Sequence, residues 1–533
     1  MYQRFLFSFC AAILCFSLMI TRLAGLATQS ALLSAADQQS AAVLQVAQTR
    51  GVIYDRLMRP LTCIETEQIA AVLPCNQAAD ALLRRTPAEE RQALLEKLTG
   101  MRPFLWQVDS GDIYAKGIDV FPVARRYLDE QPAVHLIGQL DAATGQGASG
   151  LELAYDSLLS AAGGSLQMRY FTDALGRGIP GSPPERIDTG YNSGAGLVLT
   201  LDRDLQQLAE RAAVPLERGA VVIMDPQTGD LLASASVPAF HPNNPAGDMN
   251  DPGLPFLNRA FCAYSVGSTF KLLVAAAALE QGYPPSRSFD CQGAIEVLDQ
   301  TFHCHNLNGH GVLDMRGALE HSCNPYFISL ALELGGAPLL YKAQQLGFGT
   351  AFEAAPGFRS YSGTLPTARE LLAPAATANF GFGQGALTAT PVQIACLVSA
   401  IANGGGAITP RLVAGSTVDG ASLANPTAIY SPRPVFLPEA AEQIRRMMVS
   451  VVEEGSGKNA KPRRGGAGGK TASAQTGQYL DGEEVVHAWF AGFYPAEEPR
   501  YTIVVFCEGG DSGGDRACPV FKEIADGIAA LGL

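Results

Sequence analysis

The sequence has little charge for its length. Lys, Arg, Asp and Glu make up 17% of its 533 residues, whereas hydrophobic residues make up 47%. Intrinsic disorder requires low hydrophobicity with high charge, and coiled coils are rich in charged residues, so both classes are excluded. Positive charge is especially scarce, because 38 Lys and Arg stand against 51 Asp and Glu, a net charge of −13. Nucleic-acid binding usually needs a basic surplus, so we expect no nucleic-acid partner.

Long hydrophobic runs are missing except at the N-terminus. Residues 5–20 carry no charge, and the apolar run continues to residue 27 if the Arg22 side chain snorkels outward. That length suffices for a membrane span, which needs about 20 residues. We expect residues 1–27 to be an uncleaved, single-pass membrane anchor with the remaining chain outside the cytoplasm. A cleaved signal peptide is the alternative, because small residues near Ala24 and Ala27 fit a cleavage site.

Cysteine is sparse, with 11 residues in the whole chain. An extracytoplasmic location permits disulfides, although spacing alone does not establish pairing and free buried thiols are the alternative. Close spacing suggests three disulfides: Cys63–Cys75, Cys291–Cys304 and Cys507–Cys518.

One of these pairs lies among residue types that bind zinc. The spacing of this group matches no regular zinc template, and the same residues fit a disulfide beside surface histidines. We therefore expect no metal site and no cofactor. The residues concerned are Cys291, His303, Cys304, His305 and His310.

The order of predicted elements indicates an α+β fold. Apolar runs predict strands at 219–224 and 231–237, joined by a turn, and three more at 469–475, 484–493 and 501–507. Helical patterns fill 265–455 between them. A sheet with strands from both ends of a domain and helices from its middle is an α+β layout. The Gly-rich segment 190–196 is the best linker, so we expect an N-terminal region at 28–190 and a larger domain at 191–533.

Two further local predictions concern the N-terminal region. Residues 28–47 have the composition of a helix that continues the anchor. Thr86, Pro87 and Glu89 predict the start of another helix, because Thr caps, Pro fits the first turn and Glu completes a capping box.

A serine and a lysine are spaced by three residues in the sequence STFK. Ser268 and Lys271 precede an apolar helical stretch, so both side chains share one face at its N-terminus. Burial and the helix dipole lower the pKa of such a lysine, which can then take the serine proton. The motif alone is weak, because a helix-capping Ser and a surface Lys are common.

Two more short motifs follow in order. Ser322, Cys323 and Asn324 form the first, although Asn324 alone also fits a helix cap before Pro325. Lys470, Thr471 and Ser473 begin a predicted strand after a Gly-rich turn, which places three donors on or near one side for a ligand carboxylate. A phosphate loop is excluded, because Arg464 stands where that motif needs its first Gly.

The three motifs together, S-x-x-K, S-x-N and K-T-x on helix, loop and strand, form the signature of penicillin-binding proteins and serine β-lactamases. The chain resembles the class B penicillin-binding proteins, the monofunctional peptidoglycan transpeptidases. Further matches cover most of its length: residues 50–56 (RGVIYDR), 150–156 (GLELAYD), 383–385 (GQG) and 390–393 (TPVQ). Thr390 and Gln393 also form a capping box by themselves.

The resemblance implies a serine β-lactamase-like domain at 191–533, with an antiparallel sheet flanked by helices, on an elongated mixed α/β pedestal or dimerisation-type region at 28–190. It implies a D,D-transpeptidase that forms a serine acyl-enzyme with stem peptides and is acylated by β-lactams. By this resemblance, Ser268 would be the nucleophile, Lys271 the general base and Ser322 a proton relay. Substrate would be bound by Asn324, Lys470, Thr471 and Ser473.

Three alternatives accompany this reading. A β-lactamase or a D,D-carboxypeptidase uses the same fold, and a non-catalytic wall-synthesis scaffold would also bind membrane partners. The pedestal suits a wall enzyme at the cell membrane, with a polytopic glycosyltransferase as a partner. One residue departs from the family, because Ala472 replaces the usual Gly, and its methyl group either crowds the ligand side of the strand or points into the sheet.

Overall fold

A computed structural model describes residues 2–28, 41–179, 181–480 and 482–533. It divides into two compact units that interleave along the chain. The first unit contains residues 1–50, 63–126 and 161–193, and the second contains residues 51–62, 127–160 and 194–533. The single boundary predicted near residue 190 misses this interleaving, because β2 (Val52–Tyr54) pairs in parallel with β8 (Gly196–Leu199) of the second unit.

The first unit begins with helix α1 (Tyr2–Ala27), of which Tyr2–Leu26 is long and apolar enough to cross a membrane. Residues 29–40 lie outside the described residues, and the predicted helical continuation is wrong at its end, since Ala41–Gln48 is strand β1. The predicted helix start at Thr86 is also wrong: its hydroxyl donates to the Leu82 carbonyl (2.9 Å), and the next helix begins at Arg91. Other elements here are β3 (Thr66–Val72), α3 (Asn76–Leu83), α4 (Arg91–Thr99), β4 (Phe104–Val108), β5 (Ile118–Ala124), β6 (Ser165–Phe171) and β7 (Glu185–Asp188).

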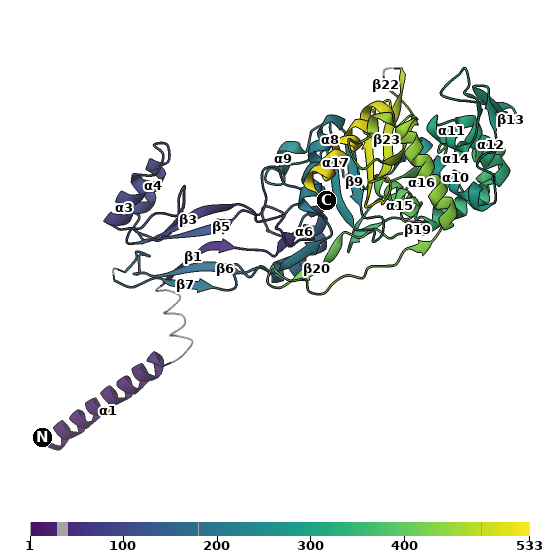
Figure 1. The fold of residues 1–533 in the computed structure, drawn as a ribbon. Coiled ribbons are helices and arrows are strands. Elements are labelled where there is room, and N and C mark those ends of the chain that lie inside the picture. The colour runs from purple at the N-terminus through teal and green to yellow at the C-terminus, as the bar shows by residue number, and fades with distance from the viewer. Residues whose placement is uncertain (1, 29–40, 180, 481) are drawn as a thin grey trace. The chain divides into compact units, whose positions relative to one another are not determined.

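The second unit is built on a five-stranded antiparallel sheet of order β10-β9-β24-β23-β22, which confirms the predicted fold class (Figure 1). Both ends of the unit supply its strands, as the apolar runs predict. They are β9 (Gly219–Met224), β10 (Leu231–Val237), β22 (Gly468–Leu480), β23 (Glu483–Tyr494) and β24 (Tyr501–Cys507).

The two faces of this sheet belong to two different hydrophobic cores. Alternation along β9 sends Val222 toward one core and Val221 toward the other. Helices α8 (Arg203–Ala213) and α17 (Cys518–Leu531) cover the face that carries Val221. On the opposite face, α15 (Pro391–Ala402) and α16 (Pro438–Glu453) contact the sheet directly. The other helices from the middle of the sequence join the same core: α10 (Lys271–Glu280), α11 (Met315–Glu320), α12 (Asn324–Leu334), α13 (Gly336–Gln345) and α14 (Pro374–Gly381).

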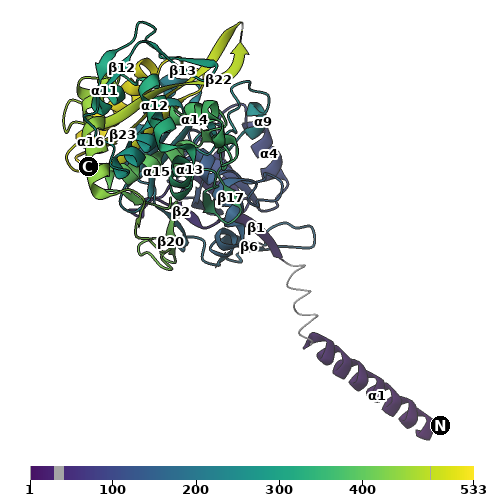
Figure 2. The same cartoon turned by 90° about the vertical axis from the view of Figure 1, so that its right-hand side faces the viewer.

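Short elements complete the second unit. The predicted capping box at Thr390 and Gln393 is present at the start of α15. Small two-stranded pairs lie beside α12 (Figure 2). The short elements are α5 (Val134–Ile137), α6 (Gly150–Ala154), α7 (Asp156–Ala161), α9 (Pro245–Asp248), β11 (Tyr264–Ser265), β12 (Phe289–Cys291), β13 (Ala294–Val297), β14 (Gln300–His303), β15 (Gly311–Leu313), β16 (Glu353–Ala355), β17 (Phe358–Arg359), β18 (Thr388–Ala389), β19 (Gly406–Ala407), β20 (Val413–Thr417) and β21 (Arg433–Pro434).

A buried carboxylate explains why residues 51–62 pack with the second unit. Asp55 is fully buried and accepts hydrogen bonds from the backbone N–H groups of Leu57 (2.9 Å), Arg59 (2.8 Å) and Arg203 (3.1 Å). The Arg59 guanidinium also donates to Asp55 (2.7 Å). The carboxylate thus ties this segment to the N-terminus of α8.

We expect Asp55→Ala to destabilise the second unit by at least about 3 kcal/mol, because it leaves buried N–H donors without an acceptor. Asp204→Ala is the matched control, since Asp204 also pairs with Arg59 (2.6 Å) but is 43% exposed, so its loss costs about 1 kcal/mol or less. Denaturant unfolding of both variants measures the difference. Equal effects would contradict the role given to Asp55.

Candidate active site

Ser268 lies in a tight turn that leads into α10. The turn, Gly267–Phe270, is a 3-10 helix, and Lys271 starts the α-helix. Gly267 has φ of +52°, and a Cβ at this position would lie 3.0 Å from the Ala474 Cβ. Only glycine therefore lets the turn approach β22 so closely. Ser268 is half-buried and Lys271 fully buried, in the predicted positions three residues apart.

The Lys271 amine is the centre of a hydrogen-bond network. Its Nζ donates to the Ser322 carbonyl (2.7 Å), to the Asn324 Oδ1 (2.7 Å) and to the Ser322 Oγ (3.3 Å). Asn324 begins α12, but Cys323 holds the cap position, and the Asn324 amide turns to Lys271 and to the His303 carbonyl (3.2 Å). The simple capping interpretation of Asn324 is therefore wrong.

The third motif reaches the same network from β22. Lys470 is fully buried, and its Nζ donates to the Ser322 Oγ (2.9 Å) and to the Thr471 carbonyl (2.8 Å). Ser322 has φ of +53°, a backbone conformation that is costly for a residue other than glycine. Its hydroxyl thus lies between two lysines, so the structure brings together Lys271, Ser322, Asn324 and Lys470.

Burial of two amines around one hydroxyl changes their protonation. Burial lowers the pKa of Lys271 from its ordinary value to about 7. Burial, and then repulsion from Lys271, holds the pKa of Lys470 well below its usual range. Because charged amines lose hydration in this site and repel each other, a neutral Lys271 is available near neutral pH. A neutral amine can accept a proton, which an ammonium group cannot.

The sequence predicted that Lys470, Thr471 and Ser473 lie on or near one side of their strand. In β22 they lie on two different faces. Thr471 Oγ1 hydrogen-bonds the Ser456 Oγ (2.7 Å), and the Ser473 Oγ accepts from the Gly513 N–H (3.4 Å). Lys470 lies on the opposite face, because successive side chains of a strand alternate. Thr471 is buried and Ser473 is exposed.

Ala472 shares the Lys470 face. It is 3% exposed, and its Cβ would lie 3.5 Å from a Cβ placed at Gly267. The Ala472 methyl group therefore belongs to the hydrophobic core and packs against the turn that carries Ser268.

None of the eleven cysteines, all of which lie in the described residues, forms a disulfide in the structure. The predicted pairs Cys63–Cys75, Cys291–Cys304 and Cys507–Cys518 are therefore absent. Cys75 instead receives the Ala78 N–H at the start of α3 (3.4 Å), and the Cys507 thiol donates to the Leu216 carbonyl (3.6 Å). Cys291 and Cys304 lie in a cluster with His310 and Cys323. The zinc-binding residue types named from the sequence do not include Cys323, because that residue was assigned to the motif of Ser322 and Asn324.

Comparison with known proteins agrees with this geometry. Residues 219–526 match the family described as "Penicillin binding protein transpeptidase domain". The chain is 29% identical over 492 residues to stage V sporulation protein D of Bacillus subtilis, covering 88% of this chain and 73% of the relative. It is 29% identical over 409 residues to peptidoglycan D,D-transpeptidase PbpA of Mycolicibacterium smegmatis, covering 70% and 78%.

A solved structure shows the same fold. The complex between penicillin-binding protein 2 and MreC from Helicobacter pylori contains a chain that aligns with a TM-score of 0.65 at 23% identity, over 92% of this chain and 99% of that one. The family match covers more than half of the sequence and includes all three motifs. The chain therefore belongs to the penicillin-binding protein transpeptidase family, as a class B member.

Proposed function

We propose that the chain is a peptidoglycan D,D-transpeptidase in which Ser268 attacks the carbonyl of a D-Ala-D-Ala bond in a stem peptide. The Ser268 Oγ–C bond forms, the peptide bond breaks, and D-Ala leaves with a proton. An amine of a second stem peptide then attacks the acyl-enzyme and releases Ser268, which completes the cross-link. The observation that carries this proposal is the network of Lys271, Ser322, Asn324 and Lys470 beside the Ser268 turn.

The network supplies the proton transfers. Neutral Lys271 takes the proton of Ser268, since both lie on one face of the first helical turn. Ser322 contacts both lysines and can pass a proton toward the leaving amine. Backbone N–H groups of Ser268 and Ser473 would form the oxyanion hole, in which one donor is worth about 3–4 kcal/mol.

The terminal carboxylate of the substrate would bring a negative charge to the site of the two buried lysines. Asn324 would contact the peptide, and Thr471 and Ser473 would bind the terminal carboxylate. A bound carboxylate favours the charged form of Lys470, which burial otherwise disfavours. β-Lactams would acylate Ser268 in the same way.

The apolar N-terminal helix supports a proposed location and a proposed partner. Helix α1 would hold the enzyme in the cell membrane as a single-pass protein, with the catalytic unit outside the cytoplasm. Residues 63–126 and 161–190, two parts of the predicted region 28–190 that belong to the first unit, would serve as a pedestal for the transpeptidase domain predicted at 191–533. A polytopic membrane glycosyltransferase would supply the glycan strands that this enzyme cross-links.

The full-length chain in detergent tests the proposal. With a stem pentapeptide donor and an amine acceptor, we expect a cross-linked product, one D-Ala released per cross-link, and a stable mass increase of one drug molecule on benzylpenicillin treatment. Rapid drug turnover would indicate a β-lactamase instead. Release of D-Ala without cross-linking would indicate a carboxypeptidase, and no reaction at all would indicate a scaffold.

The rate of acylation should depend on pH through Lys271. Because the base must be neutral, we expect the rate to fall about tenfold per pH unit below a pKa of about 7 and to level off above it. Stopped-flow acylation by a fluorescent penicillin between pH 5 and 9 measures this profile. A flat profile across pH 7 would contradict Lys271 as the base.

A further inference from the structure

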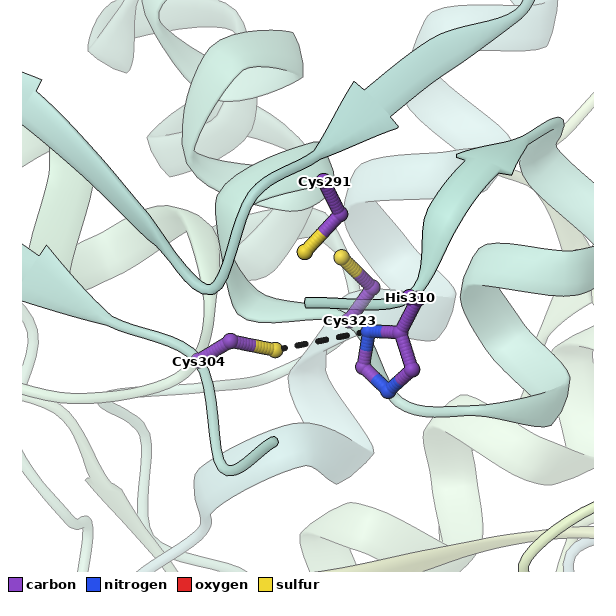
Figure 3. Close-up of side chains that lie close together, drawn as sticks. All are labelled: Cys291, Cys304, His310 and Cys323. Carbon is purple, nitrogen blue, oxygen red and sulfur yellow. Dashed lines mark hydrogen bonds between the residues drawn. The ribbon is translucent and has the colours of Figure 1, made fainter. Parts of the chain in front are cut away.

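Four metal-ligand side chains from separate elements meet beside the active site. Cys291 ends β12, Cys304 follows β14, His310 precedes β15 and Cys323 precedes α12. Figure 3 shows the three sulfur atoms and the His310 ring gathered around one point. The ligand atoms all lie within 4.8 Å of one another, and the Cys304 Sγ lies 3.6 Å from the His310 Nδ1.

These distances suit a tetrahedral zinc ion. With Zn–S bonds of about 2.3 Å, sulfur ligands at the corners of a tetrahedron lie about 3.8 Å apart. The three cysteines are buried and His310 is half-buried, so the cluster is closed to further ligands in the way of a structural site. Three thiolates and one imidazole select zinc over magnesium or calcium, which prefer oxygen.

The backbone around the cluster is shaped to bring these ligands together. Gly309 has φ of +78°, and a Cβ there would lie 2.1 Å from the Cys291 carbonyl. The His310 N–H donates to that same carbonyl (3.0 Å), and the Cys304 N–H donates to the Gly293 carbonyl (2.8 Å). The ligands therefore sit in two tight turns held against each other.

The segment that carries three of the ligands has only a small hydrophobic cluster, in which Val297 packs with Ile328 and Ala378. Its strands form two separate two-stranded pairs, β12 with β15 and β13 with β14. Isolated two-stranded pairs are marginally stable. Large apolar side chains here face solvent, since Leu298, Leu307 and Val312 are each more than 70% exposed. A metal ion would add to the stability that this small hydrophobic cluster supplies.

The cluster is joined to the catalytic network by covalent bonds and one hydrogen bond. Cys323 stands between Ser322 and Asn324, both of which contact Lys271. His303, next to Cys304, accepts the Asn324 amide through its carbonyl. Fixing Cys304 and Cys323 on one ion therefore fixes the turn that holds Ser322 in its costly conformation.

We propose that Cys291, Cys304, His310 and Cys323 bind one structural Zn²⁺ ion that stabilises the β12–β15 segment and positions Ser322 and Asn324. The three thiols lose their protons as the ion binds. Ser322 and Asn324 stay the groups that meet substrate, and the four ligands are positioning residues.

Metal analysis of the full-length protein tests the site. After purification in zinc-containing buffer and dialysis, we expect about one zinc ion per chain, and Co²⁺ replacement should give the absorption of a tetrahedral thiolate complex. Cys304→Ser and His310→Ala should each lose most of the zinc. The matched controls, Cys396→Ala for a buried cysteine outside the cluster and His305→Ala for the adjacent histidine, should keep it.

A second readout concerns the active site and rests on the proposed function, whereas metal content does not. Removal of zinc from the wild-type protein should slow acylation by benzylpenicillin about tenfold and lower the unfolding temperature, with recovery on adding zinc. Absence of zinc from folded, penicillin-reactive protein would overturn the site. Loss of two mass units from a disulfide among the three cysteines, which thiol alkylation would reveal, would overturn it as well.

Discussion

Ser268→Ala should lower covalent labelling by benzylpenicillin by at least about four orders of magnitude, the largest effect expected of any single substitution. The hydroxyl is the attacking group, and the rest of the site cannot replace it, although binding alone leaves a small residual rate. The methyl group fits the half-buried position, so the fold should be unchanged. Intact-protein mass spectrometry and D-Ala release measure the loss.

Ser265→Ala is the matched control for this variant. Ser265 lies in β11, three residues before the nucleophile, and it contributes its backbone carbonyl to Trp489 (3.0 Å). Because a backbone contact survives the substitution, labelling should stay within about twofold of the wild type. A drug adduct on the Ser268→Ala protein would mean that another residue is the nucleophile.

Lys271→Met should slow acylation by about three to four orders of magnitude. A positioned general base contributes up to about 10⁴-fold, and methionine keeps an unbranched side chain that reaches as far as Cε without the amine. The Ser322 and Asn324 contacts are lost with it. Stopped-flow acylation gives the rate, and the pH dependence below about 7 should disappear from the residual rate.

Stability separates a catalytic effect from a folding effect in this variant. Replacing a fully buried amine with an apolar side chain removes a desolvation cost but leaves the Ser322 and Asn324 oxygens without this donor, so the unfolding temperature should change little. Lys458→Met, in the short turn Lys458–Ala460, is the control and should change neither quantity. A Lys271→Met protein that acylates at the wild-type rate would exclude Lys271 as the base.

Local patterns predicted much of the second unit. The apolar runs at 219–224, 231–237 and 501–507 match β9, β10 and β24 in full, because these strands are buried on both faces and are therefore rich in apolar residues. The capping box at Thr390 also formed as predicted, since a cap depends on residues within one turn. Thr86 has the same local signature, yet its hydroxyl closes the preceding helix, because its neighbours offered a competing acceptor.

The sequence by itself determined the motifs, the sheet strands and the apolar N-terminal helix, since each depends on residues close together in the chain. Only the tertiary structure decided what distant residues do. It placed the Ser322 hydroxyl between Lys271 and Lys470, and it gathered Cys323 with Cys291, Cys304 and His310. Spacing cannot predict such contacts, because they depend on how turns and strands pack and not on local periodicity.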